Sequence, residues 1–141
     1  MRHLKRFNES SKDQIILTMD DVRKTKHNLG YGDKPDNFLS NYGWEETQQL
    51  VAMPSHNKPE TCDGKEVKIW NLYDKGSSER MLGREIGYAI SIDGVIEYLI
   101  SIYEPHGCSL NAKRGCITAH GHEQIIKLWL DDGEFEETHT R

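Results

Sequence analysis

The segment IGYAISIDGVIEYLISIY, residues 86–103, decides the fold class because large and small side chains alternate along it. Strict alternation is typical of a half-buried β-strand, and it holds on both sides of Asp93-Gly94. Asp-Gly between two such runs is a strong signal for a tight hairpin turn. The segment therefore predicts a β-hairpin with strands over 85–92 and 95–103.

The register of this hairpin follows from the placement of its large residues. A two-residue loop would pair Ile90 with Glu97 and leave large residues on both faces. A three-residue loop beginning at Ile92 pairs Ile90 with Ile96 instead. Because a slip of one residue moves a strand's whole set to the other face, we expect burial to favour the three-residue loop. One face then carries Ile86, Tyr88, Ile90, Ile96, Tyr98 and Ile100.

Outward from the hairpin, two more strands are expected at 66–73 and 115–119, which are rich in β-branched and aromatic residues. Short helices are expected in the N-terminal half, over 19–28 and 44–53. Thr18 and Asp21 have the spacing of a capping box at the start of the first helix. Residues 104–115 are expected to form a loop.

The segment HEQIIKLWLDDG, residues 122–133, allows two interpretations. Apolar residues at 125, 126, 129 and 130 lie on one face of a helix. Alternatively, Ile126 and Leu128 begin a second hairpin that turns at Asp132-Gly133. We favour a helix over 121–131, because a strand would point Ile125 and Trp129 outward. The predicted fold is α+β, with a mainly antiparallel sheet of three to four strands and this C-terminal helix packed on one face.

The 141 residues are enough for one domain. We expect a flexible N-terminal arm over 1–12, a single α+β domain over 13–133 and a solvated acidic tail over 134–141. The chain carries a net charge of −5 and has no basic stripe with interleaved aromatic residues, which argues against a nucleic acid partner.

The chain has three cysteines, an odd number, and their spacing does not match that of a disulfide framework, so a secreted disulfide scaffold is not indicated. The basic start is not followed by the apolar region of a secretion signal, and no run has the roughly 18 apolar residues of a membrane span. We therefore expect a cytoplasmic location and no membrane partner. Nothing in the sequence indicates an oligomeric state.

A group of potential ligands raises the question of a metal site or a catalytic site. It consists of His106, Cys108, Cys116, His120 and His122. The spacing matches no zinc finger, knuckle or ribbon, although the ligand types are right. We expect no metal and no cofactor, and His120 and His122 in particular should diverge at a strand-to-helix junction. The alternative is a small metal-binding protein or hydrolase that uses this cluster, with Cys108, Cys116, His120 and His122 as the metal ligands.

Four aromatic residues lie among glycines and asparagines in the segment 28–44: Tyr31, Phe38, Tyr42 and Trp44. Aromatic residues on an irregular scaffold are typical of recognition surfaces, so these four are candidate binding residues. The alternative is that they pack over the sheet as a small satellite core.

The first ten residues, MRHLKRFNES, resemble the start of small accessory proteins of large tailed bacteriophages. This resemblance implies a viral protein that acts in the host cytoplasm. It also implies a non-enzymatic protein, often an inhibitor, that binds and modulates a host protein or a host defence system. The expected function is therefore protein binding rather than catalysis, with a partner that the sequence does not identify.

Overall fold

The computed structural model describes residues 14–30, 49–75 and 83–139, and most of these residues lie in β-strands. The strands form one sheet of seven and one sheet of four. The larger sheet contains β1 (Ile15–Thr18), β2 (His27–Leu29), β3 (Gln49–Pro54), β4 (Glu60–Cys62), β5 (Lys65–Asp74), β6 (Glu85–Ile92) and β7 (Val95–Ser101). The smaller sheet contains β8 (Gly107–Asn111), β9 (Cys116–Gly121), β10 (Gln124–Trp129) and β11 (Phe135–His139).

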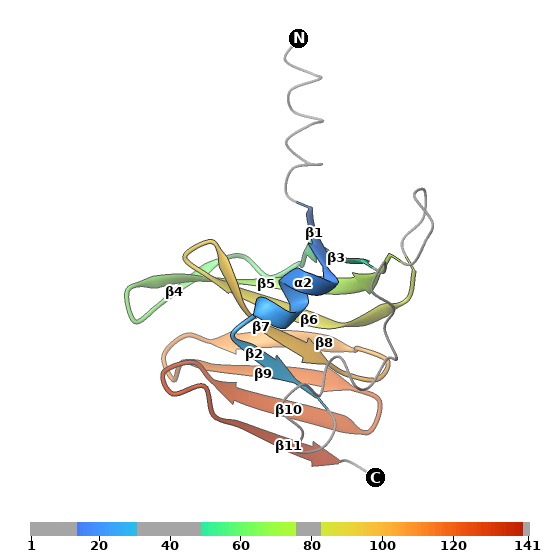
Figure 1. Cartoon of the computed structure of the whole chain (residues 1–141). Coiled ribbons are helices and arrows are strands. Elements are labelled where there is room, and N and C mark those ends of the chain that lie inside the picture. The colour runs from blue at the N-terminus through green and yellow to red at the C-terminus, as the bar shows by residue number, and fades with distance from the viewer. Residues whose placement is uncertain (1–13, 31–48, 76–82, 140–141) are drawn as a thin grey trace.

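The two sheets form two layers, with β8–β11 on one side of the larger sheet (Figure 1). The strand order is β1-β3-β5-β6-β7-β2 in the larger sheet, where β4 also pairs with β5, and β11-β10-β9-β8 in the smaller one. The main core lies between the layers. It joins buried residues of the larger sheet, such as Ile90 and Ile100, to Ile117, Ile126 and Leu128 of the smaller sheet.

A second core covers the opposite face of the larger sheet, beneath the helix α2 (Met19–Lys24). Met19 and Val22 of α2 pack there against residues of β5, β6 and β7, including Trp70, Ala89 and Leu99. In Figure 1 the helix accordingly crosses in front of these strands.

The position of α2 requires the larger sheet to curl. β1 and β2 lie at opposite ends of its strand order, five interstrand steps apart, which is about 24 Å in a flat sheet. The chain connects them through the six residues of α2 and a short link, a span of about 20 Å. The sheet therefore bends around the helix, which closes its concave face.

The predicted hairpin is present, but its register differs from both expected pairings. The turn has two residues, Asp93 and Gly94, both with positive φ, and Ile92 pairs with Val95. A bulge then follows, because Ser91 pairs with Ile96 while Ile90 pairs with Tyr98, and Glu97 is the extra residue. The expected pairing of Ile90 with Ile96 is therefore wrong.

The bulge brings large side chains together on one face, which is the effect expected of the three-residue loop. It places Tyr88 and Ile90 on the same core face as Tyr98 and Ile100. Two of the six residues that we expected on this face lie on the opposite face of the sheet. Ile86 is buried in the second core, and Ile96 packs against that core and is partly buried. Ile86 changes face at a second register shift, where Leu72 pairs with Gly87 and Tyr73 pairs with Glu85.

The C-terminal helix predicted over 121–131 is wrong, and so is the α+β class. The segment instead forms the hairpin that was the alternative interpretation, with β10 between β9 and β11. Gln124, Ile126 and Leu128 are fully buried at every second position, whereas Ile125 and Trp129 lie on the outer face and are only partly buried. The preference for the helix rested on burying those two residues, and the outer face of the sheet accommodates them.

Other expectations need smaller corrections. The capping box at Thr18 and Asp21 is confirmed, but α2 ends at Lys24 and residues 27–29 form β2. Of the helix expected over 44–53, residues 49–53 belong to β3, because Leu50, Val51 and Ala52 are buried on both faces of an interior strand. Part of the loop expected over 104–115 forms β8, and residues 135–139 of the expected tail form β11.

The strands expected at 66–73 and 115–119 are confirmed as β5 and β9. The proposed arm over 1–12 lies outside the described residues. Within the described ranges, no helix has the length and apolar character needed to cross a membrane.

Candidate functional site

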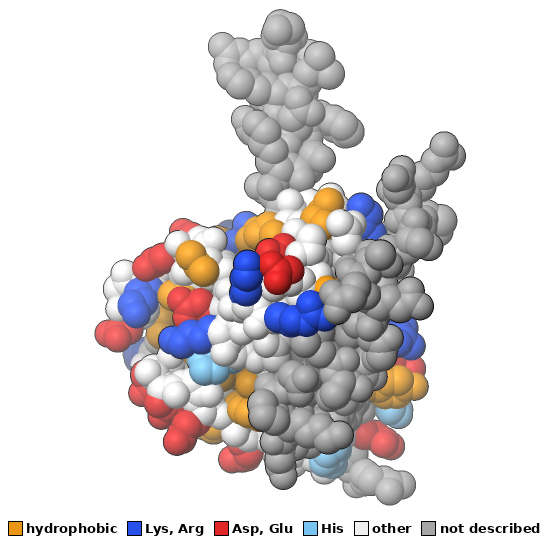
Figure 2. Space-filling view, viewed as in Figure 1, with side chains coloured by type: hydrophobic (Ala, Val, Ile, Leu, Met, Phe, Trp, Pro, Cys, Tyr) orange, Lys and Arg blue, Asp and Glu red, His pale blue; other side chains and the backbone are white. Residues whose placement is uncertain are grey.

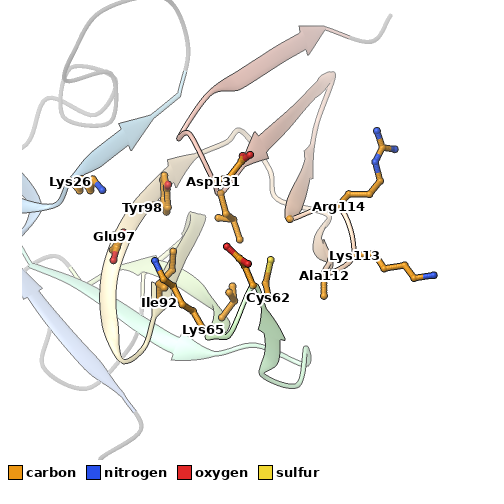
Figure 3. A pocket seen from close by; sticks show the side chains of 14 residues that line it. Lys26, Cys62, Lys65, Ile92, Glu97, Tyr98, Ala112, Lys113, Arg114 and Asp131 are labelled. Atoms are coloured by element: carbon orange, nitrogen blue, oxygen red, sulfur yellow. The ribbon is translucent and has the colours of Figure 1, made fainter.

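A pocket of about 550 Å³ opens at one end of the two-layer structure, between the sheets (Figure 3). Its walls come from the link between α2 and β2, the β4–β5 turn, the ends of β6 and β7, and the β8–β9 and β10–β11 turns. These parts are far apart in the sequence. They meet because alternate turns of antiparallel strands lie at the same end of a sheet.

The turns at this end have conformations that their residues favour. Asp63 and Gly64 join β4 to β5 with φ values of 53° and 79°, a two-residue turn that suits Asp-Gly. The tip at Asp93 is tied to β5, since its amide donates to the Glu66 carbonyl at 2.8 Å and its carboxylate accepts from the Glu66 amide at 2.9 Å. The pocket is therefore framed by tight turns.

The floor of the pocket is the apolar end of the main core. Val67 and Ile92 contribute from the larger sheet, and Leu130 contributes from the β10–β11 turn. The Cys62 side chain also lines the floor and is 8% exposed. A ligand that entered here would contact apolar side chains below and polar side chains around the rim.

Half of the fourteen lining residues are charged: Lys26, Asp63, Lys65, Glu97, Lys113, Arg114 and Asp131. None of these seven forms an ion pair with another residue in the described part of the chain. Lys26 and Glu97 lie on one side of the pocket, while Lys113 and Arg114 lie on the other and extend outward (Figure 3). Small-molecule pockets are mostly apolar, so this lining is better suited to a polar ligand.

Tyr98, one of the lining residues, is stacked on the ring of His27. The His27 and Tyr98 rings are parallel within 11°, with centroids 4.7 Å apart. Gly133 of the β10–β11 turn closes over them, and a Cβ at this glycine would lie 3.1 Å from Cε1 of His27. This contact fixes the turn that carries Asp131 against the larger sheet.

Burial controls the charge state of both rings. Burial lowers the pKa of His27, and Lys26 lowers it further while Glu97 opposes the shift. Burial raises the pKa of Tyr98, and the nearby Glu97, Asp132 and Asp131 carboxylates raise it further. Both side chains are therefore uncharged at neutral pH, and the charge of the pocket comes from its lysines, arginine and acids.

The proposed Cys and His cluster does not come together. Cys108 pairs with Ala119 and packs against the main core, whereas His120 lies one position further along β9 on the exposed outer face. Cys116 shares the side of His120, because the two are four positions apart in one strand. His106 donates its backbone amide to the His120 carbonyl at 2.7 Å.

His122 lies in the β9–β10 turn, where Nδ1 is 3.6 Å from Oε2 of Glu104 and the ring meets the Tyr103 ring edge to face. The chain is extended through residue 121, so the strand-to-helix junction on which we based the divergence of His120 and His122 is absent. Among the described residues, no group of three or more His, Cys, Asp or Glu side chains is arranged to hold a metal ion.

Cys108 is also poorly suited to nucleophilic chemistry. Burial raises the pKa of its thiol to about 12. Because the thiolate is the reactive form, this side chain is protonated and unreactive at neutral pH. The cluster therefore lends no support to the alternative of a hydrolase.

The four aromatic candidates Tyr31, Phe38, Tyr42 and Trp44 lie outside the described residues, so their role as a recognition surface stays a prediction. The sequence reasoning missed the end pocket. A signal was present in the turns at Asp63-Gly64, Asp93-Gly94, Gly115 and Asp132-Gly133, which indicate an antiparallel chain whose loops gather at one end.

The chain matches no family model, no curated protein and no solved structure in the comparisons with known proteins. The geometry and chemistry of the pocket are therefore the basis for inferring a function.

Proposed function

We propose that this chain is a non-enzymatic binding protein that holds a polar segment of a protein partner in the pocket at the end of the two sheets. The observation that carries the proposal is the set of seven charged lining residues, none of which forms an ion pair with another described residue, at the edge of an apolar floor. Charges of both signs offer a partner loop several complementary contacts, and the floor offers area for one apolar side chain.

The pocket provides little for covalent catalysis. Cys62 is its one cysteine, and among the hydrogen bonds of the described residues none joins Cys62 to a histidine. A nucleophile normally needs a base within hydrogen-bond distance. Binding requires no such pair, so it accounts for the observed arrangement with fewer assumptions.

The partner is proposed to be a bacterial host protein, and the location the host cytoplasm. The support is the resemblance of residues 1–10 to phage accessory proteins, together with the three free cysteines, Cys62, Cys108 and Cys116, which suit a reducing compartment. A nucleic acid partner is disfavoured, because basic and acidic side chains are interspersed on the described part of the face in Figure 2.

The experiment compares proteins captured from a bacterial lysate by the wild-type chain and by pocket variants. Lys65→Glu and Glu97→Lys reverse charges in the lining, while Lys127→Glu makes the same kind of change on the exposed outer face of β10. We expect a partner that the wild-type chain and Lys127→Glu retain and that both pocket variants lose. Thermal unfolding confirms that each variant is folded.

Higher salt should weaken the interaction, because the contacts at the rim are exposed and are screened by ions. Capture of the same proteins by the wild-type chain and both folded pocket variants would contradict the proposal. Turnover of a substrate by the purified chain would contradict its non-enzymatic part.

A further inference from the structure

The β11 strand lies at the edge of the four-stranded sheet and pairs with β10 on one side. The hydrogen-bond pattern of the hairpin shows which of its backbone groups point outward. The Trp129 amide donates to the Glu134 carbonyl at 2.9 Å, so these residues face each other in a hydrogen-bonded pair. Bonded pairs recur at every second residue of an antiparallel ladder, which makes Lys127–Glu136 and Ile125–Thr138 the next ones.

The pairing of β10 with β9 gives the same alternation. The Leu130 amide donates to the Gly115 carbonyl at 2.9 Å, so the even-numbered residues of β10 bond to β9 and the odd-numbered ones to β11. The amides and carbonyls of Phe135 and Glu137 therefore point away from β10. Neither residue has a backbone hydrogen bond to another described element.

Some of the usual protections against strand addition are missing from this edge, while its charged side chains are acidic and repel only acidic strands. Natural edge strands are commonly blocked by proline, lysine or a bulge. The β11 sequence, Phe-Glu-Glu-Thr-His, contains neither proline nor lysine, and its register with β10 has no shift. Phe135 is 38% exposed. Among the described strands, none pairs with the outward side of β11 at Phe135 and Glu137.

The charge along this edge selects the kind of strand that fits. Residues 131–139 contain no lysine or arginine and four exposed acids: Asp131, Asp132, Glu134 and Glu136. The Glu137 carboxylate is turned inward, where it accepts from Nε2 of Gln124 at 2.9 Å and lies 3.3 Å from Nε2 of His139. A second copy of β11 would bring like charges together, which disfavours pairing between two copies of this chain. A strand with lysine or arginine side chains would meet complementary charge instead.

We propose that β11 is a docking edge for an extended, basic segment of a partner protein, which adds to the smaller sheet as a fifth strand. The outward groups of Phe135 and Glu137 pair with its backbone, and the acids around them select its basic side chains. Asp131 also lines the end pocket, but Phe135 and Glu137, which supply the strand pairing, do not. Either proposal can fail without the other.

The test uses the full chain and a short synthetic peptide of alternating lysine and valine, capped at both ends. Two control peptides accompany it: one with glutamate in place of lysine, and one with the lysines kept but with every second amide N-methylated. The methylated peptide keeps the charge and cannot complete the strand pairing. Hydrogen exchange and amide chemical shifts are followed by NMR.

We expect the lysine peptide to slow exchange at the amides of Phe135 and Glu137, whereas Glu136 and Thr138 are already protected by β10. The methylated and glutamate peptides should bind at least about tenfold more weakly, since two or more hydrogen bonds or the charge match are lost. Phe135→Pro removes an outward donor at an edge position that tolerates proline, and should also lose binding, while Phe135→Ala retains most of it.

Two results would overturn the proposal. Equal binding of the methylated peptide would show attraction of charge without strand pairing. Absence of binding by the lysine peptide, or pairing of β11 with a second copy of the chain, would show that the edge does not accept a basic strand.

Discussion

The protonation of His27 links the stability of the fold to pH. Its pKa is lowered in the folded chain, chiefly by burial, with Lys26 acting in the same direction and Glu97 opposing it. Between this lowered value and the ordinary value of about 6.5, the unfolded chain binds more protons than the folded chain. The contribution of His27 to stability is therefore present above about pH 6.5 and is lost as the pH falls through the folded value.

The variant His27→Phe keeps a ring against Tyr98 and removes the titrating group. We expect its free energy of unfolding to fall less than that of the wild type as the pH is lowered from about 7.5 to about 5. Urea denaturation across this range, with the other histidines shared by both proteins, measures the difference. If the free energies of unfolding of both proteins fell equally with pH, burial would not lower the pKa of His27 as stated.

A buried hydrogen bond in the second core gives another prediction for a single residue. Nε1 of Trp70 donates to Oγ of Ser91 at 2.9 Å, and both side chains are buried. Ser91→Ala leaves the indole donor without a partner, at a cost of about 1–3 kcal/mol in the free energy of unfolding. The matched change Ser109→Ala, at an exposed position in β8, should stay within about 0.5 kcal/mol of the wild type. Equal effects would show that the bond contributes little.

At the scale of elements, the C-terminal hairpin buries one of two adjacent isoleucines much more than the other. Ile126 is fully buried between the sheets, while Ile125 is partly exposed on the outer face. Ile126→Ala should cost about 2–5 kcal/mol, and Ile125→Ala about 1 kcal/mol or less. Chemical denaturation of the two variants provides the comparison. Similar large losses at both positions would favour the helix that we first expected.

Local signals explain which elements the sequence predicted well. The hairpin at Asp93-Gly94 and the cap at Thr18 depend on neighbouring residues, and both are present. The bulge at Glu97 depends on how the two cores share the large residues, which alternation alone does not specify. The choice between helix and strand at 124–129 depended on whether Ile125 and Trp129 could lie on an outer face, which is a property of the assembled sheet.

At the scale of the whole molecule, the candidate site exists because the smaller sheet covers the larger one. Lys26, Lys65, Tyr98 and Asp131 are separated by long stretches of sequence and meet at the open end. No short motif contains them. The turn residues indicated that loops gather at one end, but which side chains meet there depends on the order of the strands. The potential ligands near Cys116 were close in sequence, yet the alternation of β9 and the β9–β10 turn separate them.

Residues 107–139 form the sheet that faces the larger sheet and completes the pocket. Gly121 lies against Ile102, and Gly133 lies against the rings of His27 and Tyr98. The most direct test is NMR of the full chain, with NOEs measured from the Hα protons of these two glycines. We predict contacts from Gly121 to the Ile102 methyl groups and from Gly133 to the His27 ring. Sequential amide contacts typical of a helix over 121–131, without either glycine contact, would contradict both the fold and the pocket.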